Sequence, residues 1–497
     1  MNWHEKHVET GFYPPVTYLL IDDLDVARKE GVQRVMNRPE RVPEPVLQRD
    51  RPWEVGTDMR FFPGALFYDP EEKLFKLYYM VQDPAFREEY PDLKWDQRPA
   101  YAVSPDCRNW EKPELGLVEW GGSKANNLVE LPYPVGGAPL ENVFMNPLDE
   151  GNGSRYLSLC MERHVKQPGE RAVVFPGGPP EHENPLACGQ FLFESPDGLT
   201  WTRRGGKQLS NSIVMDGLNI HGYDDELQAW ILWPRARYQP NAAQKYRTIG
   251  VSITRDLERI PYPRMALAPD EDDPPGVDFD RMMSIKVPGG YVGLVRVGRY
   301  IVDPVKGKTE FPHECQLAFS RDAIAWSRPA GRDSYLTCGP EGSWDSHSLL
   351  PANPIQVGDD IYILVSANTV IHDGRIGLYT LKRDRWVAIE PASAMPGVLE
   401  TRPTYFAGQV LHVNADARGG ALRVEIVDAL TGEPLPGHSA AEADPLTGDA
   451  VDHACSWKGR TEIPSSLIGE AYSEGLPGRV LKIRFHLERA RLFAYSC

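Results

Sequence analysis

Ser104-Pro105-Asp106-Cys107-Arg108-Asn109-Trp110 is the first of three near-copies of one seven-residue stretch in this chain. The other two are Ser195-Pro196-Asp197-Gly198-Leu199-Thr200-Trp201 and Ser320-Arg321-Asp322-Ala323-Ile324-Ala325-Trp326. All three fit the frame Ser-x-Asp-x-x-x-Trp, which we call the box. The Ser and Asp side chains of such a frame can hydrogen-bond the backbone of their own turn. The box therefore predicts a hairpin turn, with its Trp packed on the strand that follows.

Two weaker copies extend the pattern to five units. Residues 254–260 keep the hydroxyl and the Asp, and residues 381–386 keep a Trp after a charged turn. A strand-like run precedes each copy: 100–103, 190–193, 246–251, 316–319 and 376–379. Each unit reads as strand, acidic or Gly turn, strand, loop, strand, box and strand. Five copies of one supersecondary unit favour radial repetition, so we predict an all-β chain with a five-bladed β-propeller.

The pattern also divides the chain into three parts. Residues 1–50 are mixed, and we expect them to wrap around the outside of the first repeat. Residues 51–397 hold the five units and form the propeller. Residues 398–497 contain alternating strands between Gly- and Pro-rich turns but no box, which predicts a C-terminal β-sandwich.

Composition excludes some classes of function. The net charge of −16 argues against a nucleic-acid partner, because proteins that bind phosphate backbones usually carry a basic face. No apolar run has the length of a membrane span, and the N-terminus lacks a signal-peptide pattern. The seven cysteines form no metal-type pair, which favours reduced thiols in a cytoplasmic protein, or a secreted one whose signal peptide has been removed. The sequence does not indicate an oligomeric state.

Polar residues at the heads of the innermost strands are the candidate site, because these strands line the axial funnel of a propeller. Every unit offers a carboxylate there, and paired carboxylates are what glycosidic cleavage needs. Crowding of like charges would raise one pKa and so create a general acid. The candidates are Asp58, Arg60, Glu141, Asn142, Asp216, Asn219, His221, Asp278, Asp280, Arg281, Asp345 and His347.

A five-bladed propeller followed by a β-sandwich resembles the glycoside hydrolases of the invertase, fructanase and arabinanase type. The matching stretches are the boxes, residues 62–68, Gly342-Ser343-Trp344-Asp345 and residues 480–495. The chain looks like an uncharacterised branch, because invertases open with Asn-Asp-Pro where this sequence has Phe61-Phe62-Pro63.

The resemblance implies roles for the candidate residues. Asp58 matches the nucleophile or base and Asp216 the stabilising carboxylate, while either Asp280 or Glu141 would be the acid. Sugar hydroxyls would be held by seven of the other candidates: Arg60, Asn142, Asn219, His221, Arg281, Asp345 and His347. The substrate would be an oligo- or polysaccharide of fructan or arabinan type. No metal ligands or cofactor are implied, apart from a single structural cation that the funnel could hold.

Two alternatives remain open. A propeller can also bind a glycan or a protein without catalysis, since the fold alone does not determine function. A funnel with two carboxyls at glycosidase separations would favour catalysis, whereas one carboxylate flanked by arginines would favour binding. A polysaccharide lyase would need a Tyr or Lys base beside an arginine or a metal, and an acidic funnel argues against its acidic substrate.

Overall fold

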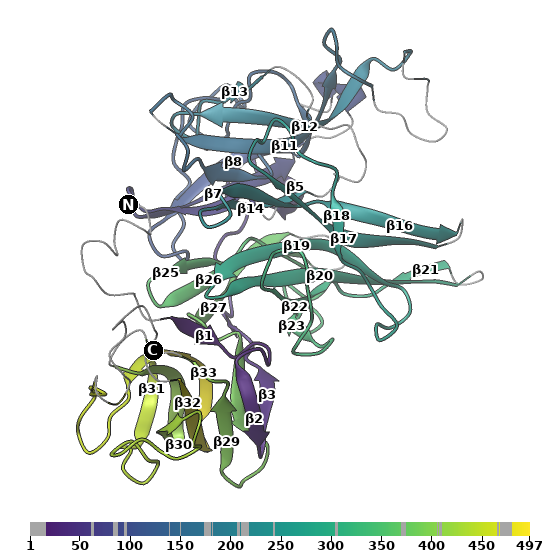
Figure 1. Ribbon diagram of the computed structural model, residues 1–497. Coiled ribbons are helices and arrows are strands. Elements are labelled where there is room, and N and C mark those ends of the chain that lie inside the picture. Colours follow the sequence, from purple (N-terminus) through teal and green to yellow (C-terminus); the bar gives the residue numbers. More distant parts are fainter. Residues whose placement is uncertain are drawn as a thin grey trace.

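The computed structural model describes most of the chain (Figure 1). The described residues are 16–60, 64–82, 88–93, 97–138, 140–149, 151–172, 180, 182–205, 209, 218–241, 244–303, 307–368, 374–404, 406, 410–464, 467 and 480–497. Within them, the side chains of 55–60, 92, 137–138, 237–241, 244–246, 302–303 and 307–310 are not described. The described residues include no helix with the length and hydropathy of a membrane span.

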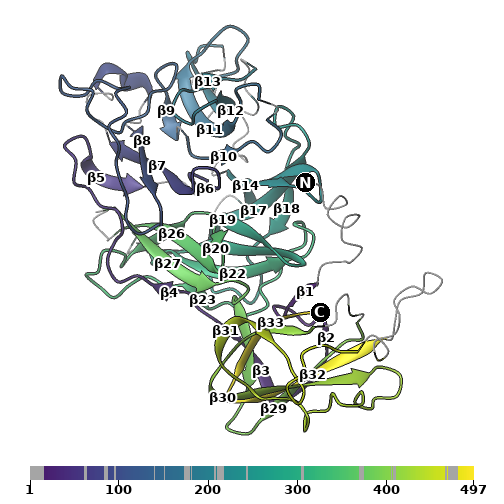
Figure 2. The ribbon, with the colours of Figure 1, turned by 90° about the vertical axis from the view of Figure 1, so that its left-hand side faces the viewer.

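Five antiparallel sheets follow one another around a ring in chain order, as Figure 2 shows, and this confirms the predicted five-bladed propeller. Blade one contains β5 (Val55–Arg60), β6 (Leu66–Asp69), β7 (Leu74–Gln82) and β8 (Gln97–Ser104), with a 3-10 turn at Pro91–Leu93. Blade two contains β9 (Gly136–Ala138), β10 (Val143–Met145), β11 (Tyr156–Val165), β12 (Leu186–Ser195) and β13 (Thr202–Arg203). Blade three contains β14 (Asn219–Asp224), β15 (Ala229–Trp233), β16 (Arg235–Asn241), β17 (Gln244–Thr254) and β18 (Arg264–Leu267).

The last two blades complete the ring. Blade four contains β19 (Val277–Val287), β20 (Gly290–Asp303), β21 (Gly307–Glu310), β22 (Glu314–Ser320) and β23 (Ser334–Leu336). Blade five contains β24 (Ser348–Pro351), β25 (Ile355–Val357), β26 (Asp360–Asn368) and β27 (Arg375–Lys382). Its outermost strand is β4 (Glu40–Arg41), which pairs with β27 although it comes from the N-terminal segment. The sheet of the last blade thus contains a strand that precedes the first blade in the sequence, and this strand closes the ring.

The boxes form the turns that the sequence predicts. In the second copy, Ser195 Oγ donates to Asp197 Oδ1 at 3.0 Å, and that oxygen accepts the N–H groups of Leu199 and Thr200 at 2.8 and 2.7 Å. The other two copies repeat these bonds. Trp201 packs edge-on against Tyr78 of blade one with ring centroids 6.2 Å apart. The tryptophan of the second box therefore lies at the boundary between blades one and two.

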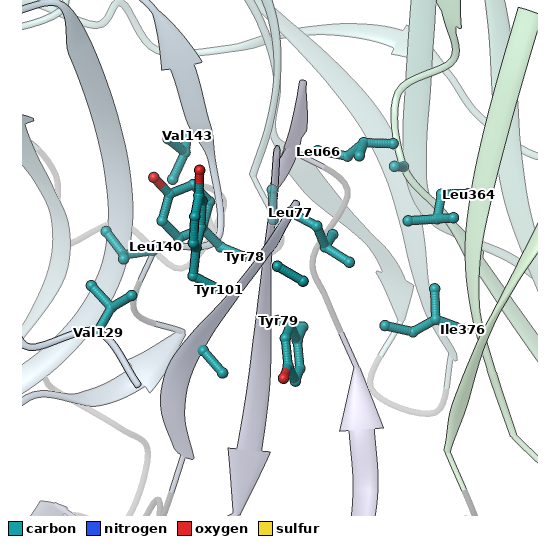
Figure 3. Close-up of a cluster of buried hydrophobic side chains, with 14 of the residues drawn as sticks. Leu66, Leu77, Tyr78, Tyr79, Tyr101, Val129, Leu140, Val143, Leu364 and Ile376 are labelled. Atoms are coloured by element: carbon teal, nitrogen blue, oxygen red, sulfur yellow. The ribbon is translucent and has the colours of Figure 1, made fainter. Parts of the chain in front are cut away.

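Apolar packing between blades holds the ring together. Leu77 and Tyr78 are neighbours on β7, so their side chains point to opposite faces of the sheet. In Figure 3, Tyr78 points toward Leu140 and Val143 of blade two, while Leu77 points toward blade five. All four of these side chains are almost completely buried. A single apolar cluster thus spans the boundaries of blade one with both of its neighbours.

A nine-stranded sheet lies beside the propeller and folds back on itself into two layers (Figures 1 and 2). Its strands are β1 (Thr17–Leu19), β2 (Val26–Glu30), β3 (Val32–Met36), β28 (Val387–Pro391), β29 (Gly397–Thr401), β30 (His412–Asp428), β31 (Leu446–Ala454), β32 (Leu481–Glu488) and β33 (Arg491–Ser496). The long strand β30 belongs to both layers, because it pairs with β33 at one end and with β32 at the other. A separate apolar core fills the space between the layers.

The N-terminal segment differs from the expectation that it wraps around the first repeat. Strand β1 pairs with β33, β2 pairs with β29, and β3 pairs with β28. The physical reason is that the backbone groups of these short strands need partners, which the open edges of the C-terminal sheet provide. The segment then continues as β4 into blade five.

Candidate functional site

The inner strand of blade four carries two carboxylates, Asp278 and Asp280, near its head. Both are buried, and both contact Arg247 of β17 in blade three. The backbone N–H of Arg247 donates to Asp278 Oδ1, and its Nη1 donates to Asp280 Oδ1 at 3.1 Å. The register of β19 against β20 shifts between Phe279 and Arg281, so Asp280 lies at a β-bulge. Bulges of this kind re-aim side chains and are frequent beside active sites.

Asp280 is the centre of an arginine cluster. Arg235 Nη1 lies 2.7 Å from its Oδ1, and Arg296 Nη1 donates to its Oδ2. Arg296 also donates to the carbonyl oxygen of Leu349 and to Ser348 Oγ, both at 2.8 Å, so it joins blades four and five. One carboxylate thus gathers guanidinium groups from three different strands, β16, β17 and β20.

The two carboxylates have opposite electrostatic surroundings. Burial raises the pKa of Asp278 by more than the nearby Arg247 lowers it. Burial alone would also raise the pKa of Asp280, but the charges of Arg296, Arg235, Arg281 and Arg247 outweigh it and hold that pKa well below its usual range. Asp278 is therefore suited to carry a proton. Asp280 stays ionised, so its surroundings are unfavourable for the general acid that the sequence suggested.

Glu141, the other predicted acid, precedes β10 and is 1% exposed. Its Oε1 accepts the backbone N–H of Met161 at 3.0 Å. Its Oε2 lies 3.8 Å from Arg281 Nη1, which reaches it from blade four. Glu141 and Arg281 therefore meet across the head of blade three, close to the Asp278–Asp280 pair on the same strand as Arg281.

Asn142 and Asn219, predicted to hold sugar, instead bond neighbouring blades. Asn142 Oδ1 accepts the N–H of Ile220 at 3.2 Å, and Asn219 Nδ2 donates to the carbonyl oxygen of Met282 at 2.8 Å. Asn353 of blade five completes the series, because its Nδ2 donates to the carbonyl oxygen of Ile220 at 2.7 Å. All of these bonds cross from one blade to another. We call Asn142, Asn219 and Asn353 the asparagine belt.

His221 lies at the bulge of β14 and bonds Ser284 Oγ through Nδ1 at 2.8 Å. Burial lowers its pKa to about 4, so the ring is neutral at physiological pH. It lines a cavity of about 370 Å³ together with Phe67, Phe144 and Asn353. These residues lie further along their inner strands than the head residues Glu141 and Asp280, so this cavity occupies the other end of the axis.

Asp345 and His347 lie in the loop before β24. Both oxygens of Asp345 accept bonds from Arg41 of β4, at 2.7 and 2.8 Å, and the side chain is completely buried. It therefore has no exposed atom to offer to a sugar. The His347 carbonyl accepts the N–H of His313 at 2.9 Å, and the two rings lie 6.5 Å apart. His313 Nε2 in turn lies 2.7 Å from Tyr300 Oη, beside the arginine cluster.

Three predicted residues cannot be placed in the same way. Asp58 and Arg60 belong to β5, but the structure does not describe their side chains. Asp216 lies outside the described residues altogether. Their roles stay predictions. Among the described residues, no group of three His, Cys, Asp or Glu side chains is arranged to hold a metal ion, and all seven cysteines are free thiols. The axial cation also stays a prediction.

Sequence reasoning missed the arginines of the cluster, because Arg235, Arg247 and Arg296 do not lie on inner strands. Each of these arginines follows or interrupts an apolar run, where its side chain would be buried and would need a partner of opposite charge. This is the only indication of the cluster that the sequence contains. Their convergence depends on contacts between blades, and the repeat pattern within one blade does not reveal these contacts.

Neither a known protein family nor a curated protein matches the sequence. Several solved structures with a similar chain path are described as glycoside hydrolases or fructofuranosidases. A glycoside hydrolase is 13% identical over 70% of this chain and 94% of its own, with a TM-score of 0.44. A glycosyl hydrolase from Bacteroides ovatus is 12% identical (71% and 95% covered, TM-score 0.42), and a GH32 β-fructofuranosidase from Bombyx mori is 10% identical (99% and 95%, 0.37). At such low identity and TM-score, the resemblance does not indicate which reaction this chain performs.

Proposed function

We propose that the protein is a glycoside hydrolase that cleaves a glycosidic bond of an oligo- or polysaccharide at the heads of its inner strands. The observation that carries the proposal is the pair Asp278 and Asp280. Both contact Arg247, but the pKa of Asp278 is raised and that of Asp280 is lowered. Neighbouring carboxyls whose pKa values are pushed apart are the usual sign of an acid and an ionised partner.

In this mechanism Asp278 is the general acid. It gives its proton to the glycosidic oxygen as the bond from that oxygen to the anomeric carbon breaks. Asp58, on the inner strand of blade one, is the proposed nucleophile or base that attacks the anomeric carbon or activates water. Asp216 is the proposed stabilising carboxylate, and Glu141 is the alternative acid because it is buried beside Arg281.

The assignment is tested with a screen of aryl glycosides and oligosaccharides, followed by three variants. Asp278→Asn should lower kcat/KM about 10²–10⁴-fold on a substrate with a poor leaving group. It should lower the rate far less on an aryl glycoside whose leaving group needs no proton. Asp58→Asn should abolish turnover of both substrates. The exposed turn carboxylate of Asp225 provides a control, and Asp225→Asn should leave both rates unchanged. Equal rates for Asp278→Asn and the wild type would contradict the assignment.

A second candidate function is a propeller that binds an anionic glycan without cleaving it. The arginine cluster favours it, because four guanidinium groups act on the single carboxylate of Asp280. Such a site would attract a carboxylate or sulfate on a sugar. Calorimetry distinguishes the two functions: binding of an acidic oligosaccharide with no turnover of any glycoside in the screen would favour this candidate over the hydrolase.

A further inference from the structure

A cavity of about 280 Å³ lies between the last blade and the C-terminal sheet, and it shares no residue with the site described above. Figures 1 and 2 show β1, β31 and β33 together at the part of the C-terminal sheet nearest the propeller. Five segments line it, and their polar residues include Thr17, Arg383, Asp384, His412, Asn414, Asp452 and Ser496. The cavity is thus formed only where the two parts of the chain meet.

Asp384 is the unusual residue of this cavity. It is 8% exposed, and its carboxylate has no hydrogen-bond or ion-pair partner among the described residues. The adjacent basic side chains are engaged elsewhere. Arg383 Nε lies 2.7 Å from Asp359 Oδ1, and Arg385 Nη2 lies 2.6 Å from Asp449 Oδ1. A carboxylate that is largely buried and lacks a protein partner is well placed to bind a ligand that supplies one.

The opposite wall is also acidic. His412 Nδ1 lies 2.6 Å from Asp452 Oδ1, so these two side chains are hydrogen-bonded to each other. Asn414 is committed to the turn, because its Oδ1 accepts from Arg385 Nε and its Nδ2 donates to the Arg383 carbonyl oxygen. Among the charged side chains that line the cavity, Asp452 is thus paired with His412 and Arg383 with Asp359, which leaves the carboxylate of Asp384 without such a contact. The ligand that satisfies this arrangement is cationic.

The residues that line the cavity restrict the kind of cation that it can bind. No three His, Cys, Asp or Glu side chains of the described chain converge as metal ligands, so a divalent ion lacks its donors. Thr17 and Ser496 are among the residues that line the cavity, and a hydroxyl side chain can both donate hydrogen bonds to and accept them from the hydroxyl groups of a ligand. The volume lies just below the usual range for drug-sized ligands, which favours one sugar ring over a longer chain.

We propose that this cavity binds an amino sugar, with Asp384 as the ion-pair partner of its free ammonium group. The Asp452–His412 pair and the hydroxyls of Thr17 and Ser496 bind the ring hydroxyls. The proposal does not depend on the funnel. It gives the chain a second carbohydrate site at the junction of its two parts, whether or not the funnel is catalytic.

Titration calorimetry with four small probes tests the proposal on the full chain: glucosamine, N-acetylglucosamine, glucose and ethanolamine. Glucosamine should bind at least about ten-fold more tightly than the other three, since a charged hydrogen bond contributes that much. Asp384→Asn should weaken glucosamine binding by a similar factor. Asp360→Asn, at an exposed site in the hairpin between β25 and β26, is the matched control and should bind like the wild type.

Each other outcome contradicts part of the proposal. Equal binding of N-acetylglucosamine would exclude the ammonium group as the recognised feature, and equal binding of ethanolamine would exclude the sugar ring. Absence of glucosamine binding, or unchanged binding in Asp384→Asn, would overturn the site. A melting curve supplies an independent measurement: removing an unpaired buried charge should leave the melting temperature of Asp384→Asn unchanged or raised, and a fall would assign the carboxylate a structural role instead.

Discussion

The hydroxyl of Tyr156 donates a 2.8 Å hydrogen bond to Asp69 of the preceding blade. The same relationship recurs two blades further on, where Tyr291 lies 2.5 Å from Asp224. A lysine accompanies each carboxylate: Lys76 at 3.1 Å in the first case and Lys286 at 2.8 Å in the second. The acidic residue that ends the inner strand therefore fixes one blade to the next, and this contact is buried.

Tyr156→Phe should destabilise the protein by about 1–3 kcal/mol, because the buried carboxylate of Asp69 loses a hydrogen-bond donor that water cannot replace. Urea unfolding at pH 7 measures the change in the free energy of unfolding. Tyr262 is 77% exposed, so Tyr262→Phe is the matched control and should have no effect. Equal stability of the two variants would show that the bond between the blades contributes nothing.

The same contact predicts a pH dependence. Burial alone would raise the pKa of Asp69, but the bonds from Tyr156, the Glu72 backbone and Lys76 outweigh it and lower the pKa to about 2. Because the pKa is depressed, its contribution to stability is fully present above the unfolded value near 4 and is lost as the pH falls toward 2. The stability difference between the wild type and Tyr156→Phe should therefore be constant above about pH 5 and shrink below pH 4. Unfolding curves across this range would show it, and a difference independent of pH would contradict it.

Gly198 in the second box allows a direct test of the turn. It has a φ of +77°, and an added Cβ would lie 2.8 Å from the hydroxyl of Tyr78. Gly432 has a φ of +76° with nothing within 4 Å of that position. In both variants the positive φ destabilises the folded state by about 1 kcal/mol, because alanine is strained there. Only in Gly198→Ala is the close contact of the new Cβ with the Tyr78 hydroxyl added to this strain. Thermal unfolding should rank Gly198→Ala clearly below Gly432→Ala, and equal losses would mean that Tyr78 moves aside without cost.

The turns of the boxes could be predicted from the sequence because their hydrogen bonds join residues that are close together in the chain. Asp197 bonds N–H groups two and three residues away, so the spacing itself encodes the turn. The site depends on distant residues. Asp345 appeared at the head of an inner strand, but its carboxylate is bound by Arg41, which lies 304 residues earlier in the chain. A strand from the N-terminal segment that inserts into the last blade leaves no periodic signal.

The role of Asp280 has the same origin. Its position on the inner strand suggested an acid, whereas the acid proposed from the structure is Asp278, two residues before it. The difference between them is made by arginines of other strands and by the bulge at Asp280. A single strand read in isolation cannot show which of two acidic residues will be surrounded by guanidinium groups.

Asp280→Asn should therefore destabilise the protein, whereas Asp278→Asn should not. Removing Asp280 leaves Arg235, Arg247 and Arg296 without their common counter-ion, and breaking a buried ion pair in this way costs about 3–5 kcal/mol. Removing Asp278 replaces a carboxyl whose charged form is disfavoured by burial, so the free energy of unfolding should be unchanged or higher at pH 7. Urea unfolding of both variants at pH 7 measures this contrast. If Asp278→Asn proved the less stable of the two, Asp280 would not be the ionised centre of the cluster, and the assignment of Asp278 as the acid would lose its basis.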